Sequence, residues 1–304
     1  MKATIPILPL PLRWRCSVAF FGPDFIAARK GALYHSQNGQ HPLLAVVFAV
    51  VLFAIYSILQ VVMGSVVHLG LYGSFPALQS LVPSGTELTD PFVRVMKCMI
   101  IGILPAAILA TAASWWLAKA WNKTGDRGIP LHFPALGFGG WLVLIVGFVI
   151  VMALVFNLTF VILGIDPKDY MPSAGGIDDG GASAGLMEKI IADMADEPLL
   201  FVLALPGIAI GAPLLEEFLF RGPLFSCLHG TWLGAPGAVL VTAASWALVH
   251  GSTAPWLFVG ILFIMGLLLG AALLRFGSLW VTIILHSLWN GLVSLSMLSL
   301  VQAP

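Results

Sequence analysis

The residues that could do chemistry lie together in the most hydrophobic part of the chain. Residues 198–304 carry only four charged side chains, and three of them fall within six positions: Glu216, Glu217 and Arg221. Three polar side chains follow in the same part: His250, His286 and Asn290. A charge at the centre of a bilayer costs on the order of 2.5–3.5 kcal/mol, so this cluster requires a reason. Carboxylates and imidazoles are the usual groups of general acid–base catalysis.

The spacing of these residues separates their roles. Glu217 and Arg221 are four positions apart, so on a helix they share a face and can pair. Glu216 points about 100° away from Glu217 on the same helix, which leaves its carboxylate available for chemistry. His286 and Asn290 are also four apart and project from one face of the last hydrophobic segment.

A structural interpretation competes with the catalytic one. Charges at helix ends often extend to the membrane interface, and a single intramembrane His or Asn often only hydrogen-bonds a neighbouring helix. For any one of the six residues this interpretation is at least as good. The concentration of all six in one third of the chain favours a functional site. We interpret Arg275 and His229, near expected helix ends, as structural.

The composition sets the kind of element that must position these residues. The 304-residue chain is 59% hydrophobic and 9% charged, with no net charge, whereas a soluble domain is roughly 25% charged. The mean hydropathy of +1.00 excludes a soluble globule, a disordered tail and a basic nucleic-acid-binding protein. We therefore expect an all-α, polytopic transmembrane helical bundle with the lipid bilayer as its surroundings and no nucleic-acid partner.

Seven hydrophobic runs are long enough to approach the ~20 residues of a membrane span, and we expect about seven to eight spans. The runs are 43–63, 98–118, 141–163, 199–215, 232–249, 255–274 and 279–300. A span over 199–215 would put Glu216 at one membrane face and His250 near the other. We therefore expect a span of roughly residues 206–227, centred on Glu216, so that the two side chains meet.

Charge placement predicts the topology. Residues 1–40 are expected to be a basic cytoplasmic N-terminal extension, and residues 41–304 a single transmembrane domain. The basic connection near residues 119–127 belongs inside and the acidic stretch 166–197 outside by the positive-inside rule. This predicts a multi-pass integral membrane protein, in the plasma membrane, with a cytoplasmic N-terminus. Apolar residues at helical spacing over 186–194 predict a helix, either on the membrane surface or packed on the bundle.

Four motifs in this order carry a family resemblance. They are the segment 212–222 with Glu-Glu-x-x-x-Arg, the segment 246–250 ending in histidine, the segment 266–270 between two glycines, and the segment 286–290 with His-x-x-x-Asn. The pattern resembles the CAAX-protease and bacteriocin-processing (CPBP, Abi) family of intramembrane proteases over residues 199–300. The second motif of that family usually opens with Phe. This chain has Trp246 there, a departure that we do not expect to affect His250.

The resemblance implies an intramembrane endopeptidase acting on a membrane-associated or lipidated protein or peptide. Peptide hydrolysis needs an activated water, donors for the oxyanion and a proton for the leaving amine. We assign Glu216 as the general base and His250 as a group that holds the water. His286 and Asn290 are assigned as oxyanion donors, and Glu217 with Arg221 as supporting groups.

Other chemistries stay open at this stage. Two histidines and a carboxylate also suit zinc, but the chain has no His-Glu-x-x-His motif, so we favour metal-free catalysis and name no certain cofactor. A proton-coupled transporter would also use intramembrane carboxylates and histidines, although no internal repeat is visible. A non-enzymatic membrane partner or immunity protein is the third alternative.

The protease interpretation makes a geometric demand. Glu216, His250, His286 and Asn290 must converge on one water-sized site in a cavity that opens to the cytoplasm. Glycines four apart, at 266 and 270, would allow the close helix approach that such convergence needs.

Overall fold

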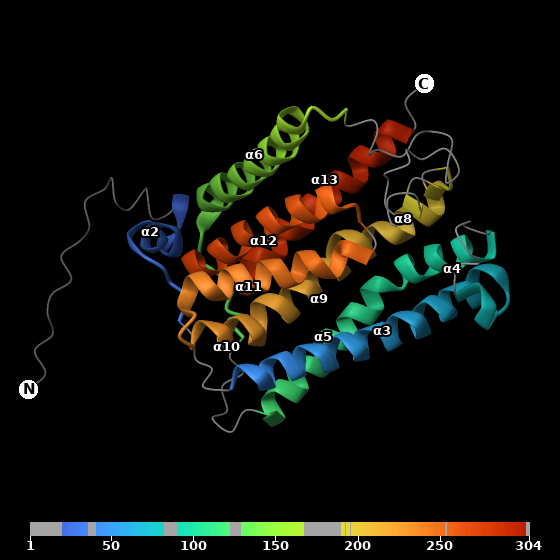
Figure 1. Cartoon of the computed structure of the whole chain (residues 1–304), viewed down its shortest axis with the longest axis horizontal. Coiled ribbons are helices and arrows are strands. Elements are labelled where there is room, and N and C mark those ends of the chain that lie inside the picture. Colours follow the sequence, from blue (N-terminus) through green and yellow to red (C-terminus); the bar gives the residue numbers. More distant parts are fainter. Residues whose placement is uncertain are drawn as a thin grey trace, which may run out of the picture.

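A computed structural model describes residues 20–35, 41–81, 90–121, 129–166, 190–252 and 254–301, except residues 192 and 195. Its regular elements in these ranges are all helices (Figure 1), which confirms the expected all-α fold. The longer ones are α3 (Pro42–Tyr72), α4 (Asp90–Ile101), α5 (Ile103–Trp121), α6 (Gly137–Leu163), α11 (Gly234–Val249), α12 (Trp256–Phe276) and α13 (Leu279–Val301). The shorter ones are α2 (Pro23–Lys30), η1 (Leu78–Leu81), α8 (Pro198–Pro206), η3 (Gly207–Gly211), α9 (Ala212–Leu219), η4 (Phe220–Leu224), α10 (Phe225–His229) and η5 (His250–Ser252).

All seven hydrophobic runs are helical, although runs 98–118 and 199–215 are each divided between successive helices, and fewer of them have the length of a complete span. Five helical stretches among the described residues are long and apolar enough to cross a membrane. A sixth span arises if α4 and α5, which meet at an angle of 49°, count together. The expected seven to eight is thus approximate, because α11 has only 16 residues.

The α4–α5 bend has a local cause. Pro105 has no N–H to donate to the carbonyl of Ile101, one turn earlier. Gly102 at the break lies against α3, where a Cβ atom would approach the backbone nitrogen of Gly64 to 2.8 Å. A residue larger than glycine at position 102 would therefore push the α4–α5 break away from α3.

One 32-residue stretch, from Pro198 to His229, carries Glu216 near its middle, as the placement of a span around Glu216 required. It is not a regular α-helix, because the π-helical segments η3 and η4 flank α9. In η3 the N–H of Ala212 bonds to the carbonyl of Gly207, five residues back. Pro213 has no N–H, so the carbonyl of Ile208 receives no hydrogen bond from the next turn of its own helix.

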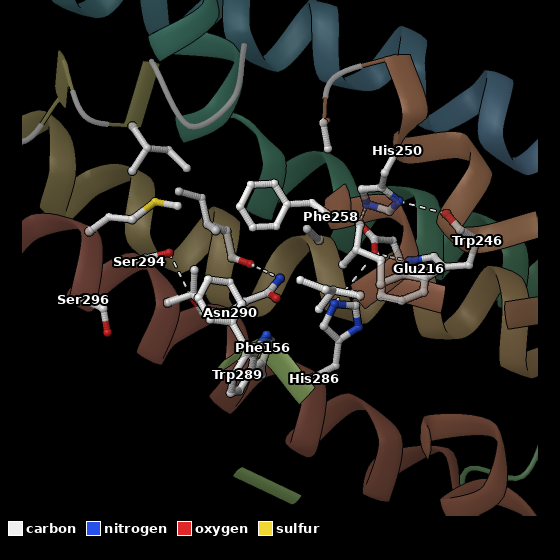
Figure 2. A pocket seen from close by; sticks show the side chains of 18 of the residues that line it. Phe156, Glu216, Trp246, His250, Phe258, His286, Trp289, Asn290, Ser294 and Ser296 are labelled. Carbon is white, nitrogen blue, oxygen red and sulfur yellow. Dashed lines mark hydrogen bonds and ion pairs between the residues drawn. The ribbon is translucent and has the colours of Figure 1, made fainter. Parts of the chain in front are cut away.

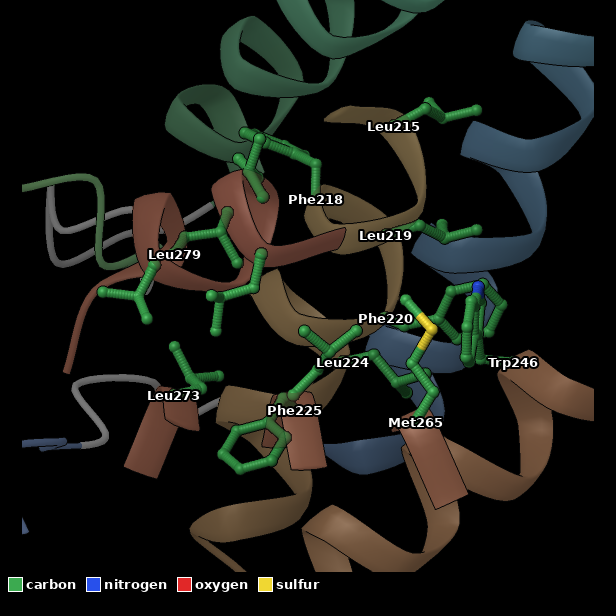
Figure 3. Packing of buried hydrophobic residues seen from close by; sticks show 14 of the residues in the cluster. Leu215, Phe218, Leu219, Phe220, Leu224, Phe225, Trp246, Met265, Leu273 and Leu279 are labelled. Carbon is green, nitrogen blue, oxygen red and sulfur yellow. The ribbon is translucent and has the colours of Figure 1, made fainter. Parts of the chain in front are cut away.

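The core surrounds this irregular span. Buried side chains of α9, η4 and α10 pack against α3, α11, α12 and α13 (Figure 3). Helices α11 and α12 approach closely, since a Cβ atom at Gly266 would lie 2.9 Å from Cβ of Ala243. At Gly270 it would lie 3.1 Å from Cγ1 of Val239. Both glycines thus serve the close packing expected of them.

Part of the expected N-terminal extension is folded against the bundle. The N–H groups of Leu33 and Tyr34 donate to the carbonyl of Leu274 at the end of α12, at 3.2 and 3.1 Å. Gly22 and Gly137 lie against each other, and both have a positive φ, of 77° and 61°. A side chain on either glycine would collide with the segment that contains the other. Residues 1–19 and 36–40 lie outside the described residues.

The helix expected at 186–194 falls mostly outside the described residues. The end that is described is buried, and Ile190, Ile191 and Met194 pack with residues of α4, α5 and α8 in a second hydrophobic cluster. Buried Lys97 of α4 makes ion pairs with Asp193 and Glu197. These contacts favour the packed alternative over a helix lying on the membrane surface.

Candidate active site

The carboxylate of Glu216 lies between two imidazole rings (Figure 2). Its Oε1 is 3.9 Å from Nε2 of His250, and its Oε2 is 3.8 Å from Nε2 of His286. The indole N–H of Trp246 donates to Oε2 at 2.6 Å. The Glu216 side chain is 21% exposed, so its carboxylate is partly desolvated yet accessible from the cavity.

Both imidazoles are oriented through their other ring nitrogen. Nδ1 of His250 lies 2.8 Å from the carbonyl oxygen of Trp246, and this contact requires Nδ1 to donate because a carbonyl only accepts. Nδ1 of His286 lies 2.9 Å from Oε1 of Glu217. The carboxylate there accepts from His286, and each ring therefore turns its Nε2 toward Glu216.

Glu217 and Arg221 form the pair that their spacing predicted. Both side chains are fully buried, and Nη1 of Arg221 donates to Oε1 of Glu217 at 3.1 Å. Nη2 of Arg221 donates to the carbonyl of Gly266 on α12 at 3.3 Å. The same Glu217 oxygen accepts from His286, so one buried carboxylate joins a cation to a site imidazole. Removing either charge would leave the other uncompensated.

Asn290 shares the cavity with these groups but has its own partner. Its Nδ2 donates to the carbonyl of Ile208 at 3.2 Å. That carbonyl is the one that the π-helical turn and Pro213 leave without a donor from their own helix. Asn290 therefore completes the hydrogen bonding of an irregular backbone segment, a role that the expected oxyanion function did not include.

A cavity of about 430 Å³ connects the four predicted residues. Glu216, His250 and His286 line it together with Asn290, and its other walls are mainly apolar. They come from α5, α6, α12 and α13, with Phe156 and Phe258 among them. The structure thus brings Glu216, His250 and His286 into direct proximity and places Asn290 in the same cavity.

Trp246 is the site residue that sequence reasoning missed. The hydrogen bond to His250 uses the Trp246 backbone, so the change from Phe leaves it unaffected, as expected. The consequence of the change falls on Glu216, which the indole N–H contacts. The available signal was chemical, because a buried indole N–H usually has a hydrogen-bond acceptor.

The spacing of donors does not fit a metal ion. Among the residues that the structure describes, no group of three His, Cys, Asp or Glu side chains is arranged to hold one. The donor types of Glu216, His250 and His286 would suit zinc, but these three side chains do not form such a group.

Residues 198–292 match a family model described as type II CAAX prenyl endopeptidase Rce1-like. The match confirms the resemblance to the CAAX-protease family, and it covers all six predicted site residues. No curated protein and no solved structure matches the chain at a significant level. Together with the apolar helices, the match identifies an integral membrane protein with a protease-like segment.

Proposed function

We propose that the protein is an intramembrane endopeptidase that hydrolyses a peptide bond of a membrane-associated or lipidated protein or peptide. The observation that carries the proposal is the Glu216 carboxylate, which faces Nε2 of His250 and of His286 in one cavity. The family match over the same segment supports it independently.

Glu216 acts as the general base. Two atoms 3.9 Å apart, such as Oε1 of Glu216 and Nε2 of His250, can both contact one water molecule at hydrogen-bond distances of about 2.6–3.2 Å. Glu216 removes a proton from this water while the water oxygen bonds to the carbonyl carbon of the substrate. When the C–N bond breaks, Glu216 returns the proton to the leaving amine.

The oxyanion requires hydrogen-bond donors on the opposite side of the reacting carbonyl. His286 keeps its bond to Glu217 through Nδ1, and its Nε2 is the ring nitrogen that is directed to the oxyanion. Asn290 has a second amide hydrogen besides the one that it donates to Ile208. Glu217 and Arg221 support this arrangement by fixing the His286 ring and the helix that bears Glu216.

The surroundings define the substrate class and location. The cavity walls are mainly apolar, which suits a lipid-modified peptide or an apolar peptide segment. The charge pattern supports a cytoplasmic N-terminus by the positive-inside rule, and the plasma membrane is the location that we propose. The cavity lining includes Asn157 late in α6 and Met297 late in α13, whereas the starts of both helices lie near residues 20–34. With the N-terminus in the cytoplasm, the cavity therefore extends toward the opposite side of the membrane, against the expected cytoplasmic opening.

The test uses purified protein and two fluorogenic peptides. One peptide ends in a prenylated cysteine followed by three residues, and the second is the same peptide without the lipid. We expect cleavage by the wild type. The cleavage rate of Glu216→Gln should be lower by at least about 100-fold, because a general base contributes about 10²–10⁴-fold to the rate. Glu197→Gln, the same change outside the cavity, should remain active.

Wild-type cleavage that persists in Glu216→Gln would contradict the proposal. Loss of proton uptake by Glu216→Gln in proteoliposomes, with no cleavage by the wild type, would favour a transporter. Comparison of peptide termini in membranes containing wild-type or Glu216→Gln protein identifies natural substrates.

A further inference from the structure

Trp246 contributes a single polar hydrogen to the site, and that hydrogen is directed at the proposed base. The side chain is 1% exposed, and its N–H has one donor hydrogen and no acceptor capacity. At 2.6 Å from Oε2 of Glu216, it makes a hydrogen bond assisted by the carboxylate charge. We infer that Trp246 is a positioning residue whose N–H anchors Oε2, so that Oε1 is the oxygen that takes the proton from water.

This inference rests on the proposed function of Glu216 and distinguishes its two oxygens. Oε2 is held by Trp246 and lies 3.8 Å from Nε2 of His286. Oε1 faces Nε2 of His250 at 3.9 Å. The donated hydrogen bond withdraws electron density from Oε2, so Oε1 is the oxygen better able to accept a proton, and the attacking water lies between it and His250.

The indole can serve as an anchor because its own position is fixed on several sides. Its ring makes edge contacts with the imidazoles of His250 and His286, with centroid separations of 5.2 Å in both cases. The guanidinium of Arg221 lies 4.8 Å from the centroid of the indole ring, a favourable cation–π geometry. Rotation of the indole would break these contacts together, so the direction of the N–H is set before substrate binds.

The same contacts explain why a ring of this size belongs at the site. Without Trp246, Glu216 could adopt other rotamers that turn Oε1 away from His250. A hydrogen bond that fixes one rotamer raises the fraction of enzyme in the reactive geometry without touching substrate. The effect should therefore appear in the rate of the bound complex rather than in substrate affinity.

The first measurement compares Trp246→Phe with wild type on the two fluorogenic peptides. Phe keeps an aromatic ring but has no N–H. Loss of a charge-assisted hydrogen bond should lower kcat about 10- to 100-fold, with KM within about twofold. The control is Trp280→Phe, which also loses an indole hydrogen bond, to the carbonyl of Leu131 at 3.0 Å, outside the cavity. It should keep wild-type kcat.

The second measurement does not depend on activity. In protein labelled with ¹⁵N at tryptophan, the indole resonance of Trp246 is identified by its absence from Trp246→Phe. Its proton signal should move upfield in Glu216→Ala, where the carboxylate acceptor is gone. Thermal unfolding of the two Phe variants shows whether their folds are equally preserved. If Trp246→Phe does not fold, single Trp→Phe variants at the other nine tryptophans assign their resonances and leave that of Trp246.

The outcomes separate this inference from the proposed function. An unchanged kcat in Trp246→Phe, a rise in KM alone, or an unmoved Trp246 resonance in Glu216→Ala would each overturn the positioning role. If Glu216→Gln is inactive while Trp246→Phe is fully active, the proposed function stands and only the inference fails. If the wild type cleaves neither peptide but the resonance moves, the hydrogen bond exists and the proposed function is what fails.

Discussion

Two adjacent carboxylates have opposite environments in this protein. Glu216 faces the cavity and contacts Trp246, whereas Glu217 is fully buried and bonds Arg221 and His286. Their side-chain directions differ because consecutive residues on a helix differ by about 100°. One carboxylate is therefore available for chemistry, and the other compensates a buried cation.

This difference predicts separate effects of two matched substitutions. Glu217→Ala leaves Arg221 buried without its carboxylate, so we expect it to lower the free energy of unfolding by about 3–5 kcal/mol. Glu216→Ala should abolish activity with a smaller loss of stability, at most about 1–3 kcal/mol for the Trp246 N–H that loses its acceptor. Thermal unfolding in detergent compares them, and equal melting temperatures of the two variants would contradict the assignment.

At the scale of elements, close helix packing depends on one glycine in α12. A methyl group at Gly266 would meet Ala243 at 2.9 Å and Nη2 of Arg221 at 3.2 Å, whereas a methyl group at Gly260 of the same helix meets nothing within 4 Å. Gly266→Ala should therefore separate α12 from α11 and destabilise the protein by about 1–3 kcal/mol. Gly260→Ala should be neutral or stabilising by up to about 1 kcal/mol.

The measurement is thermal unfolding of both variants beside wild type, followed by peptide cleavage. Because Gly266 also accepts a hydrogen bond from Arg221, activity should fall with stability. A Gly266→Ala protein as stable as Gly260→Ala would show that the interface adjusts without cost.

The contacts that sequence could predict are those between residues one turn apart in the same helical span. The pairing of Glu217 with Arg221 follows from spacing alone, as does the shared face of His286 and Asn290. The partner of Asn290 could not be predicted, because a π-helical turn adds a residue and rotates the following side chains by about 100°. The bond from Trp246 to Glu216 joins two helices whose relative depth the sequence does not encode locally.

The whole molecule brings distant parts of the chain to one end of the bundle. Leu33 bonds to Leu274, Asp24 to Ala135, and the N–H of Leu279 to the carbonyl of Pro130. The ring of Tyr34 packs against that of His229, with centroids 5.1 Å apart. The N-terminal segment is thus held by three other segments of the chain.

Docking of this segment predicts a loss of stability in alkali. Burial raises the pKa of Tyr34 to about 12, from 10.0, because the charged phenolate is poorly solvated there. The unfolded chain therefore loses this proton at lower pH, so the stabilisation is complete below pH 10 and declines as pH rises toward 12. The decline should be on the order of 2 kcal/mol, and Tyr34→Phe should remove it.

The check is the melting temperature of wild type and Tyr34→Phe between pH 9 and pH 12. Other groups titrate in both proteins, so the difference between the two curves of melting temperature against pH reports the ionisation of the Tyr34 phenol. Parallel curves would mean that Tyr34 ionises equally in the folded and unfolded chains.

Because these segments lie at one end of the bundle, the chain between His229 and the end of α12 must cross the membrane an even number of times. His229 and the end of α12 lie at the same end of the bundle, since both contact residues 33–34. If the chain crosses once along α12, it must cross once in the other direction between His229 and the start of α12. The helices in that interval are α11 and η5. That earlier passage starts with a helix of 16 residues, about 24 Å long at 1.5 Å per residue. A helix of this length is shorter than the ~30 Å hydrocarbon core of a bilayer, and the residue that follows its end is His250, whose Nε2 lies 3.9 Å from Oε1 of Glu216.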